Sequence, residues 1–318
     1  MAKVVVATAF GGPQVLSTVE EAVPDPGPDE VTIRVRAAAV NPLDYLRYSG
    51  MFGADPSWLP MRVGQELAGV VTAAGTDAVG PAGPVQVGDE VIAYPGDVAG
   101  AYAGEVTWPA RGVVPKPADL GWEPASGLLL ASGTAVHALV ATGLTSNDVV
   151  LIHGVSGSVG MIAAQLAIHR GARVIGTAGA ARHEVLRRYG VEPVSYGDGL
   201  AERVRAQAPD GVDAAIDAVG TDEALDTSLA VVSDRERIAT IVAFERGNQA
   251  GIKTLGAGGG ATDPGTEIRA QAWSELTSLA AEGKLEVVVA RTFGLAEAAA
   301  ANELVLAGHA GGKVVLLP

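Results

Sequence analysis

The chain has 318 residues and a formal net charge of −14, with 48% hydrophobic and 18% charged residues. This length allows two domains with full hydrophobic cores. A net negative charge without a cluster of basic residues argues against binding to a nucleic-acid backbone, which needs clustered Lys and Arg. Because the chain has no cysteine, disulfides, thiolate catalysis and cysteine-ligated zinc are excluded.

The apolar stretches of the chain are short. The longer ones, residues 4–10 and 161–168, are each interrupted by a polar residue. Both fall far short of the roughly 20 residues that cross a bilayer. The chain opens with an apolar run typical of a first strand and not of a secretion signal. We therefore expect a cytoplasmic protein that contacts neither membranes nor nucleic acids.

Up to about Lys116 the sequence is typical of short strands separated by turns. Residues 31–37 alternate as a half-buried strand does, and residues 24–29 before them form a turn cluster of Pro, Gly and Asp. Further strands are expected at residues 64–71 and 88–93. This pattern predicts an irregular antiparallel β domain.

From about Glu123 onward, expected strands and helices alternate. The strands are residues 149–152, 173–177, 213–219 and 237–243, and the helices residues 158–170 and 181–189. Such alternation predicts an α/β fold with a doubly wound parallel sheet. The tail adds a helix at 268–282, a strand at 285–291, a helix at 296–306 and a last strand at 313–317.

The strand at residues 149–152 leads into a turn with three glycines, spaced G-x-x-G-x-x-G. A helix N-terminus and bare backbone at one point favour a phosphate, and a Cβ there would block its approach. A plain strand-to-helix turn is the alternative. We predict that this turn holds the pyrophosphate of a nucleotide cofactor, through Gly154, Ser156, Gly157, Ser158, Val159 and Gly160.

The residues after the second strand of this sheet bear on the choice of nucleotide. An NAD site usually has an Asp or Glu there, which binds the ribose 2′-OH. Here Thr177, itself a candidate cofactor contact, is followed by small residues and then by Arg182 and His183, with no acid before Glu184. The two basic side chains can meet a 2′-phosphate, so NADPH is favoured, although Arg182 can also be a solvated helix-start residue. Tyr196 is a further candidate for the adenosine phosphate, with core packing as the alternative.

Several further segments match a known pattern in the right order. They are N-P-x-D at 41–44, G-x-E-x-x-G-x-V at 64–71, G-D-x-V at 88–91, the glycine turn and the closing strand at 311–316. With these segments the chain resembles the zinc-free quinone oxidoreductase branch of the medium-chain dehydrogenase/reductase superfamily, the group that includes zeta-crystallin. The resemblance covers nearly the whole chain.

The resemblance implies a GroES-like irregular β domain made of residues 1–118 and 257–318. It implies a Rossmann domain with a doubly wound parallel sheet for residues 119–256, and NADPH bound between the two domains. Family members are usually dimers or tetramers, so a homodimer or homotetramer acting on a small-molecule substrate is expected. Many of them reduce quinones, enones or enoyl thioesters.

Zinc-dependent relatives hold their catalytic metal with a Cys, a His beside a Glu, and a further ligand. In this chain Asp44 lies near the first ligand position, and Gln65 replaces the His beside Glu66. A neutral amide and a distant carboxylate make a poor zinc site. The histidines show no ligand spacing either, so we expect no metal.

Without a metal, hydride transfer suits an acceptor that carries its own electron sink, such as a quinone or an electron-poor C=C. By resemblance Asn41 lies near the nicotinamide and the substrate, with a turn cap as the alternative. Asp44 is a candidate for a cofactor or hydroxyl contact, with an exposed or capping role as the alternative. Tyr45 and Tyr48 are candidate proton donors. Related enoyl reductases have a tyrosine where this chain has Phe52, which disfavours an enoyl-thioester substrate.

Two further segments are predicted to contact the cofactor. Thr134 lies on a helix that resembles the one below the nicotinamide, with internal capping as the alternative. Gly256 and Gly258 follow a strand that lies where related proteins contact the nicotinamide amide through their backbone. The predicted function is a metal-free, NADPH-dependent reductase of quinones or activated C=C bonds. The alternatives are an enoyl-thioester or biosynthetic tailoring reductase, and an NADPH-binding protein with little turnover.

Overall fold

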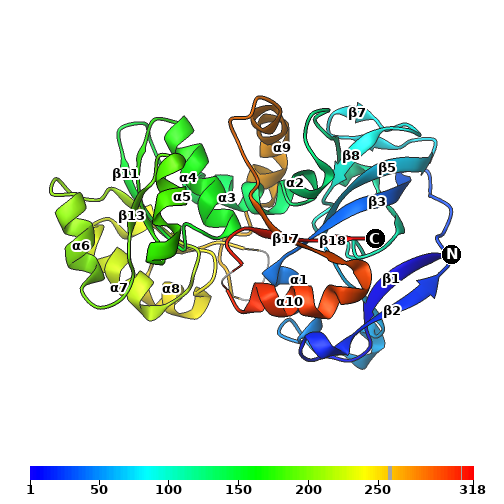
Figure 1. Cartoon of the computed structure of the whole chain (residues 1–318), viewed down its shortest axis with the longest axis horizontal. Coiled ribbons are helices and arrows are strands. Elements are labelled where there is room, and N and C mark those ends of the chain that lie inside the picture. The colour runs from blue at the N-terminus through cyan, green and yellow to red at the C-terminus, as the bar shows by residue number, and fades with distance from the viewer. Residues whose placement is uncertain (257–259, 309) are drawn as a thin grey trace. The chain divides into compact units, whose positions relative to one another are not determined.

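The computed structural model describes residues 1–256, 260–308 and 310–318, so the predicted cofactor residue Gly258 lies outside the described residues. The chain forms two compact units (Figure 1). The first comprises Met1–Leu130 and Trp273–Pro318, and the second Ala131–Ala272. The resemblance implies domain boundaries at 118 and 256, which lie before the two helices that contain these unit boundaries.

The first unit contains a large β-sheet with strand order β10-β8-β5-β3-β18-β17, and β9 also pairs with β3. Its strands are β3 (Glu30–Val40), β5 (Glu66–Ala74), β8 (Glu90–Ala93), β9 (Glu105–Pro109), β10 (Val113–Pro115), β17 (Val289–Gly294) and β18 (Lys313–Leu317). Smaller sheets are formed by β1 (Ala2–Ala7), β2 (Leu16–Glu21) and β4 (Met61–Arg62), and by β6 (Val79–Gly80) and β7 (Gly83–Pro84). The strand-rich first part of the chain is therefore confirmed as an irregular β domain.

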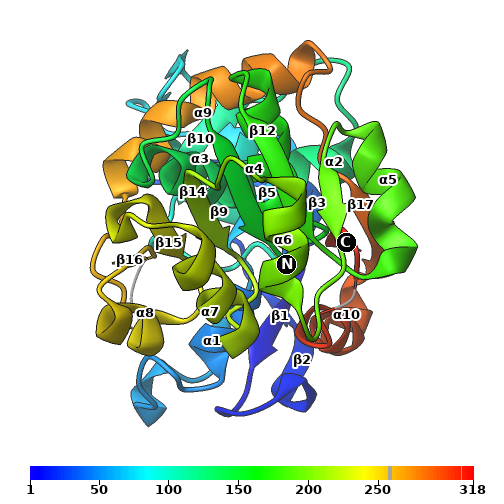
Figure 2. The ribbon, with the colours of Figure 1, turned by 90° about the vertical axis from the view of Figure 1, so that its left-hand side faces the viewer.

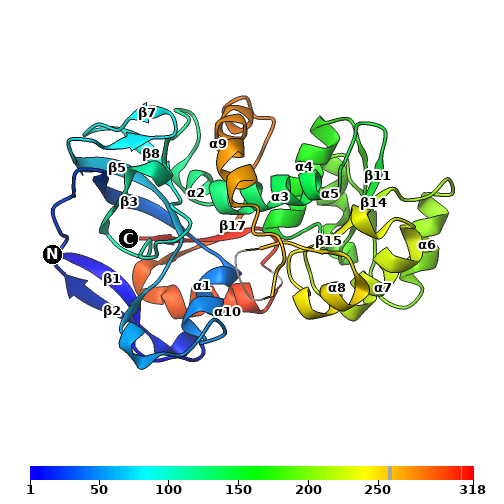
Figure 3. The same cartoon turned by 180° about the vertical axis from the view of Figure 1, so that it is seen from behind.

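The central strand of this sheet, β3, is flanked by strands from distant parts of the chain. Its Ala39 is in register with Glu66 of β5 on one side and with Val315 of β18 on the other. Charged residues at the ends of β5 and β18 therefore converge where β3 ends and the short helix α1 (Pro42–Tyr48) begins. Two further helices, α2 (Trp122–Ser126) and α10 (Ala298–Leu306), belong to the same unit, and α10 packs against α1 (Figure 3).

The second unit is built on a sheet with strand order β13-β12-β11-β14-β15-β16, in which every pairing is parallel (Figure 2). The strands are β11 (Val149–His153), β12 (Arg173–Thr177), β13 (Glu192–Val194), β14 (Ala214–Asp217), β15 (Ile238–Thr240) and β16 (Lys253–Thr254). This is the doubly wound order of a dinucleotide-binding fold, so the Rossmann prediction is confirmed. Apolar strand residues such as Leu151, Ile175 and Ile238 are fully buried in its core.

The helices of this unit alternate with its strands, as the sequence pattern predicts. They are α4 (Ser158–His169), α5 (His183–Arg188), α6 (Leu200–Gln207), α7 (Asp222–Val231) and α8 (Phe244–Ala250). Two longer helices, α3 (Leu129–Ala141) and α9 (Thr266–Ala281), contain the boundaries between the units. Within the described ranges, no helix is both long and apolar enough to cross a bilayer.

Two predicted strands are wrong in their extent. The strand expected at 237–243 ends at Thr240, because the Thr240 hydroxyl accepts hydrogen bonds from the backbone N–H groups of Val242 and Ala243 and turns the chain. The strand expected at 285–291 is β17, which begins only at Val289, where its parallel register with Lys313 of β18 starts.

The glycine turn after β11 yields a stability prediction. A Cβ on Gly160 would lie 2.4 Å from the Gly154 carbonyl oxygen, whereas one on Gly157 would meet only that oxygen, at 3.3 Å. We expect Gly160→Ala to lower the free energy of unfolding by about 2 kcal/mol, because overpacking against backbone outweighs the gain of up to about 1 kcal/mol in helix propensity. Gly157→Ala is the matched control and should cost less than about 1 kcal/mol. Urea unfolding followed by circular dichroism tests both, and equal losses would contradict the packing argument.

Candidate active site

The glycine turn of the second unit has the geometry of an anion site. Gly154 adopts a positive φ of 70°, which favours glycine, and Gly157 is the N-cap residue of α4. Gly157 is exposed and has no side chain, so the N–H groups in the first turn of α4 face a site that a ligand can approach. Ser156, Ser158 and Val159 are half-buried around it. Such an N-terminus favours a phosphate.

Thr177 holds this turn onto the neighbouring strand. Its hydroxyl accepts a hydrogen bond from the Gly154 N–H at 3.3 Å, and its carbonyl accepts one from the Val155 N–H at 3.2 Å. The hydroxyl also contacts the His153 ring at 3.3 Å. Burial lowers the pKa of His153 to about 4, so this imidazole is neutral at pH 7. Thr177 is itself buried, and its observed contacts act on the turn.

The three candidates for the adenosine phosphate lie after two neighbouring strands, Arg182 and His183 after β12 and Tyr196 after β13. Arg182 ends a short 3-10 helix directly after the strand and is half-buried. Tyr196 is 57% exposed, so the core-packing alternative for it is wrong, and its hydroxyl lies 3.5 Å from the position of a Cβ on Gly179. His183 differs, because its Nε2 donates a hydrogen bond to the Ala178 carbonyl at 3.1 Å and thereby supports the backbone.

In the first unit, Asn41 belongs to a buried cluster with Glu66 and Lys313. Lys313 Nζ lies 2.8 Å from Glu66 Oε1 and also donates to Asn41 Oδ1. The Asn41 amide donates to Glu66 Oε1 at 3.1 Å, and the Leu130 N–H donates to Glu66 Oε2 at 3.0 Å. The side chains of Lys313 and Glu66 are only 2% and 0% exposed. Charges buried this deeply must be paired and hydrogen-bonded, and both conditions are met.

Asp44 is the second buried carboxyl group near the end of β3. Its Oδ2 accepts hydrogen bonds from the Asn41 N–H and the Tyr102 hydroxyl, both at 2.8 Å. Its buried Oδ1 has no hydrogen-bond partner in the described part of the chain. Burial raises the pKa of Asp44 to about 7, although the hydrogen bonds from Asn41 and Tyr102 oppose the shift. The unpartnered Oδ1 is the atom that can carry the proton of the neutral acid.

The two candidate tyrosines of α1 differ in exposure. Tyr48 is fully buried in the hydrophobic core of the first unit, and its hydroxyl donates to Asn302 Oδ1 at 3.1 Å. Burial holds the pKa of Tyr48 well above its usual value, which opposes loss of its proton. Tyr45 is half-buried and meets Tyr48 edge-on, with ring centroids 5.5 Å apart. These contacts favour a packing role for Tyr48 and leave Tyr45 as the more accessible phenol.

The positions of zinc ligands in other relatives have different neighbours here. Gln65 is buried, and its Oε1 accepts a hydrogen bond from the Arg47 guanidinium at 3.2 Å. In the described residues, no three His, Cys, Asp or Glu side chains gather into a group that could hold a metal ion.

The remaining predicted cofactor residues lie in the second unit. Thr134 is half-buried on α3. Gly256 follows β16, and its N–H donates to the Asp263 carbonyl at 2.9 Å.

Four residues that contact the candidates of the first unit were not predicted as site residues: Glu66, Lys313, Tyr102 and Asn302. Glu66 and Lys313 each begin a largely apolar strand, and a lone charge of each sign in buried strands is a signal that could have suggested the pair. Tyr102 and Asn302 carry no such signal, since they come from a loop and from α10.

Comparisons with known proteins agree with this geometry. Residues 27–118 match the family described as alcohol dehydrogenase GroES-like domain, and residues 184–316 match zinc-binding dehydrogenase. A quinone oxidoreductase of Pseudomonas aeruginosa is 32% identical over 340 aligned positions, which cover all of both chains. A trans-enoyl reductase of Aspergillus terreus is 33% identical over 64% of this chain and 71% of its own length. The Escherichia coli quinone oxidoreductase complexed with NADPH superposes with a TM-score of 0.85 at 26% identity, covering 99% of this chain and 100% of the other.

The two folds, the glycine turn and the quinone oxidoreductase relatives together define an oxidoreductase that uses a nicotinamide cofactor. The full-length match and the matched domains show that the chain belongs to the zinc-free quinone oxidoreductase branch of the medium-chain dehydrogenase/reductase superfamily.

Asp44 makes stability depend on pH. Its pKa is about 7 in the folded protein and 3.8 as a free side chain, so folding favours the protonated form. The contribution of Asp44 to the free energy of unfolding is therefore greatest below pH 4 and is lost as the pH rises to 7 and above. Asp44→Asn mimics the neutral acid and does not titrate. Between pH 5 and pH 8 we expect the wild type to lose roughly 3 kcal/mol relative to this variant. Urea unfolding at both pH values tests this, and parallel pH profiles would contradict a raised pKa.

Proposed function

We propose that the protein transfers hydride from NADPH to a quinone or to an activated C=C bond, without a metal ion. The main support for NADPH is the sequence directly after β12, which has no acidic side chain to bind a ribose 2′-OH. Instead Arg182 follows β12, and Tyr196, which comes after β13, lies beside Gly179. The NADPH complex of the Escherichia coli relative supports the same choice of cofactor.

The dinucleotide fits the residues of the second unit. The first turn of α4 and the exposed Gly157 would hold the pyrophosphate through backbone N–H groups. Arg182 would meet the 2′-phosphate with a charge-assisted hydrogen bond. The bound cofactor supplies the hydride, whereas the protein orients the reactants and excludes water.

In the first unit, the cluster of Asn41, Glu66 and Lys313 provides a rigid polar group near α1. Both polar atoms of the Asn41 amide are engaged, with Glu66 and with Lys313, so the amide has a fixed orientation. Preorganised groups of this kind stabilise developing charge without reorganising during the reaction. Asp44 has a pKa near 7 and can hold a proton at Oδ1, although its burial separates it from direct contact with solvent.

Metal independence is supported by the chemistry of the donor set. The position next to Glu66 is an amide whose oxygen accepts a hydrogen bond from a guanidinium, and that positive charge disfavours a metal ion beside it. The carboxyl group of Asp44 is fully buried and engaged with Tyr102. A quinone or enone accepts hydride without a Lewis acid, because its product anion is delocalised.

The match to a trans-enoyl reductase favours a second candidate, reduction of an enoyl thioester. Phe52 argues against it, since related enoyl reductases have a tyrosine at that position. Phe52 is 37% exposed, and no phenol replaces it there.

The decisive experiment follows NADPH and NADH oxidation by absorbance with naphthoquinone, a simple enone and crotonyl-CoA as acceptors. We expect turnover of the quinone or enone with NADPH and little with NADH. Activity confined to crotonyl-CoA would select the second candidate. Absence of both nucleotide binding and turnover would overturn the proposed function.

Arg182→Ala tests the assignment of the 2′-phosphate. Loss of a charge-assisted hydrogen bond should raise the Kd for NADPH by about tenfold or more and leave that for NADH within about twofold. Fluorescence titration of both nucleotides measures this. Arg188→Ala is the matched control, because Arg188 is an exposed arginine of α5 that pairs with Glu184. Equal weakening of NADPH and NADH by Arg182→Ala would contradict the assignment.

A further inference from the structure

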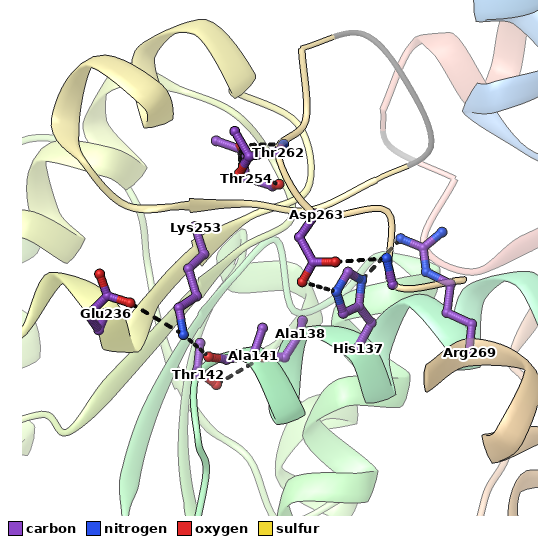
Figure 4. Close-up of polar contacts among 11 residues, drawn as sticks. His137, Ala138, Ala141, Thr142, Glu236, Lys253, Thr254, Thr262, Asp263 and Arg269 are labelled. Atoms are coloured by element: carbon purple, nitrogen blue, oxygen red, sulfur yellow. Dashed lines mark hydrogen bonds and ion pairs between the residues drawn. The ribbon is translucent and has the colours of Figure 1, made fainter. Parts of the chain in front are cut away.

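Three side chains of the second unit form a polar clasp that the predicted function does not use. His137 of α3 lies between Asp263 and Arg269 (Figure 4). Its Nε2 is 2.9 Å from Asp263 Oδ2, and its Nδ1 is 3.3 Å from an Arg269 guanidinium nitrogen. The His137 side chain is 0% exposed, whereas that of Asp263 is 48% exposed. We call these three residues the clasp.

The neighbours of His137 define its protonation. Arg269 can only donate, so Nδ1 must accept, and the ring hydrogen is then on Nε2 and is donated to the Asp263 carboxylate. Burial lowers the pKa of His137, in agreement with a neutral ring. The ring also presses against Gly265, where a Cβ would lie 2.3 Å from it. Only a glycine with its φ of 55° permits this approach.

Asp263 is also the point where two chain segments on either side of residues 257–259 meet. Its carbonyl accepts the hydrogen bond from the Gly256 N–H, and its own N–H donates to the Thr254 carbonyl at 3.1 Å. Thr262 N–H donates to the same Thr254 carbonyl at 3.0 Å (Figure 4). The backbone of Gly256 is therefore fixed through Asp263. The side chain of Asp263 is held by His137 at Oδ2 and by the Gly265 N–H at Oδ1, at 2.9 Å each.

A second contact ties the same strand to α3. Lys253 Nζ donates to the Ala141 carbonyl at 2.6 Å and lies 3.6 Å from Glu236 (Figure 4). Residues 137 and 141 are one helical turn apart, so they share one face of α3. This face of α3 contacts Lys253 at the beginning of β16, and it contacts Asp263 in the chain after Gly256.

We propose that His137 is a positioning residue, which acts through Asp263 to hold the Gly256 backbone in place for the nicotinamide end of the cofactor. This inference rests on the proposed function, because it takes Gly256 as a cofactor contact. His137 itself is not a catalytic residue. In the described residues, its buried ring is linked to the Gly256 backbone through Asp263.

The test compares three substitutions on α3. His137→Leu removes both hydrogen bonds. His137→Gln keeps a donor for Asp263 and an acceptor for Arg269, so it should rescue the function. Val136→Ala is the control for stability, because Val136 is a buried neighbour on α3 and has no part in the clasp.

The first measurement is amide hydrogen exchange of Gly256 and Asp263 by NMR, without cofactor. In His137→Leu we expect exchange about tenfold faster or more, which corresponds to the loss of roughly one hydrogen bond to a charged group. In His137→Gln and Val136→Ala it should change less than about threefold. Unchanged exchange in His137→Leu would overturn the clasp and leave the proposed function standing.

The second measurement is the Kd for NADPH and the kcat for the best acceptor. His137→Leu should raise Kd or lower kcat by about tenfold, and the other two variants should resemble the wild type. Faster exchange with unchanged Kd and kcat would overturn the link to the cofactor. A wild type that binds neither NADPH nor NADH would overturn the proposed function together with that link, while the exchange data still decide whether the clasp exists.

Discussion

The buried ion pair between Glu66 and Lys313 is the interaction on which the first unit depends. Neither charge could be buried alone, because an unpaired charge in an apolar core costs several kcal/mol. The two residues are 247 positions apart in the chain and lie on strands that flank β3. The closing strand of the chain must therefore be in register with β3 before the cluster is complete, which ties the C-terminal segment to the N-terminal β domain.

The predicted chemical groups of the first unit follow from this pair. Asn41 stands directly after β3, so its amide meets both charges and is held in one orientation. Asp44 lies in the first turn of α1 and is buried near the same cluster, and this burial disfavours its ionised form. The core therefore holds one salt bridge and one carboxyl group whose pKa is close to neutral. A polar cluster with this charge balance is rigid, and rigidity is what orientation of a substrate requires.

In the second unit, backbone geometry instead of a buried ion pair provides the rigidity. Close packing of Gly160 on the Gly154 carbonyl brings the start of α4 against β11, and Thr177 fastens the turn to β12. Few charged side chains take part, because the N–H groups of a helix terminus already provide a partial positive charge. The clasp on α3 applies the same principle to Gly256, whose backbone is held by contacts that begin at a buried side chain.

The sequence by itself determined the fold class, the order of strands and helices and the glycine turn, because periodicity and glycine spacing are local properties. It also placed Asn41 and Asp44 in a shared segment before any contact was known. Only the tertiary structure decided that Tyr48 is a core residue, that Tyr196 is exposed, and that strand β15 ends at Thr240. The tertiary structure also decided that Lys313 pairs with Glu66 and His137 with Asp263. Their partners are far apart in the chain, and strand order and register bring them together.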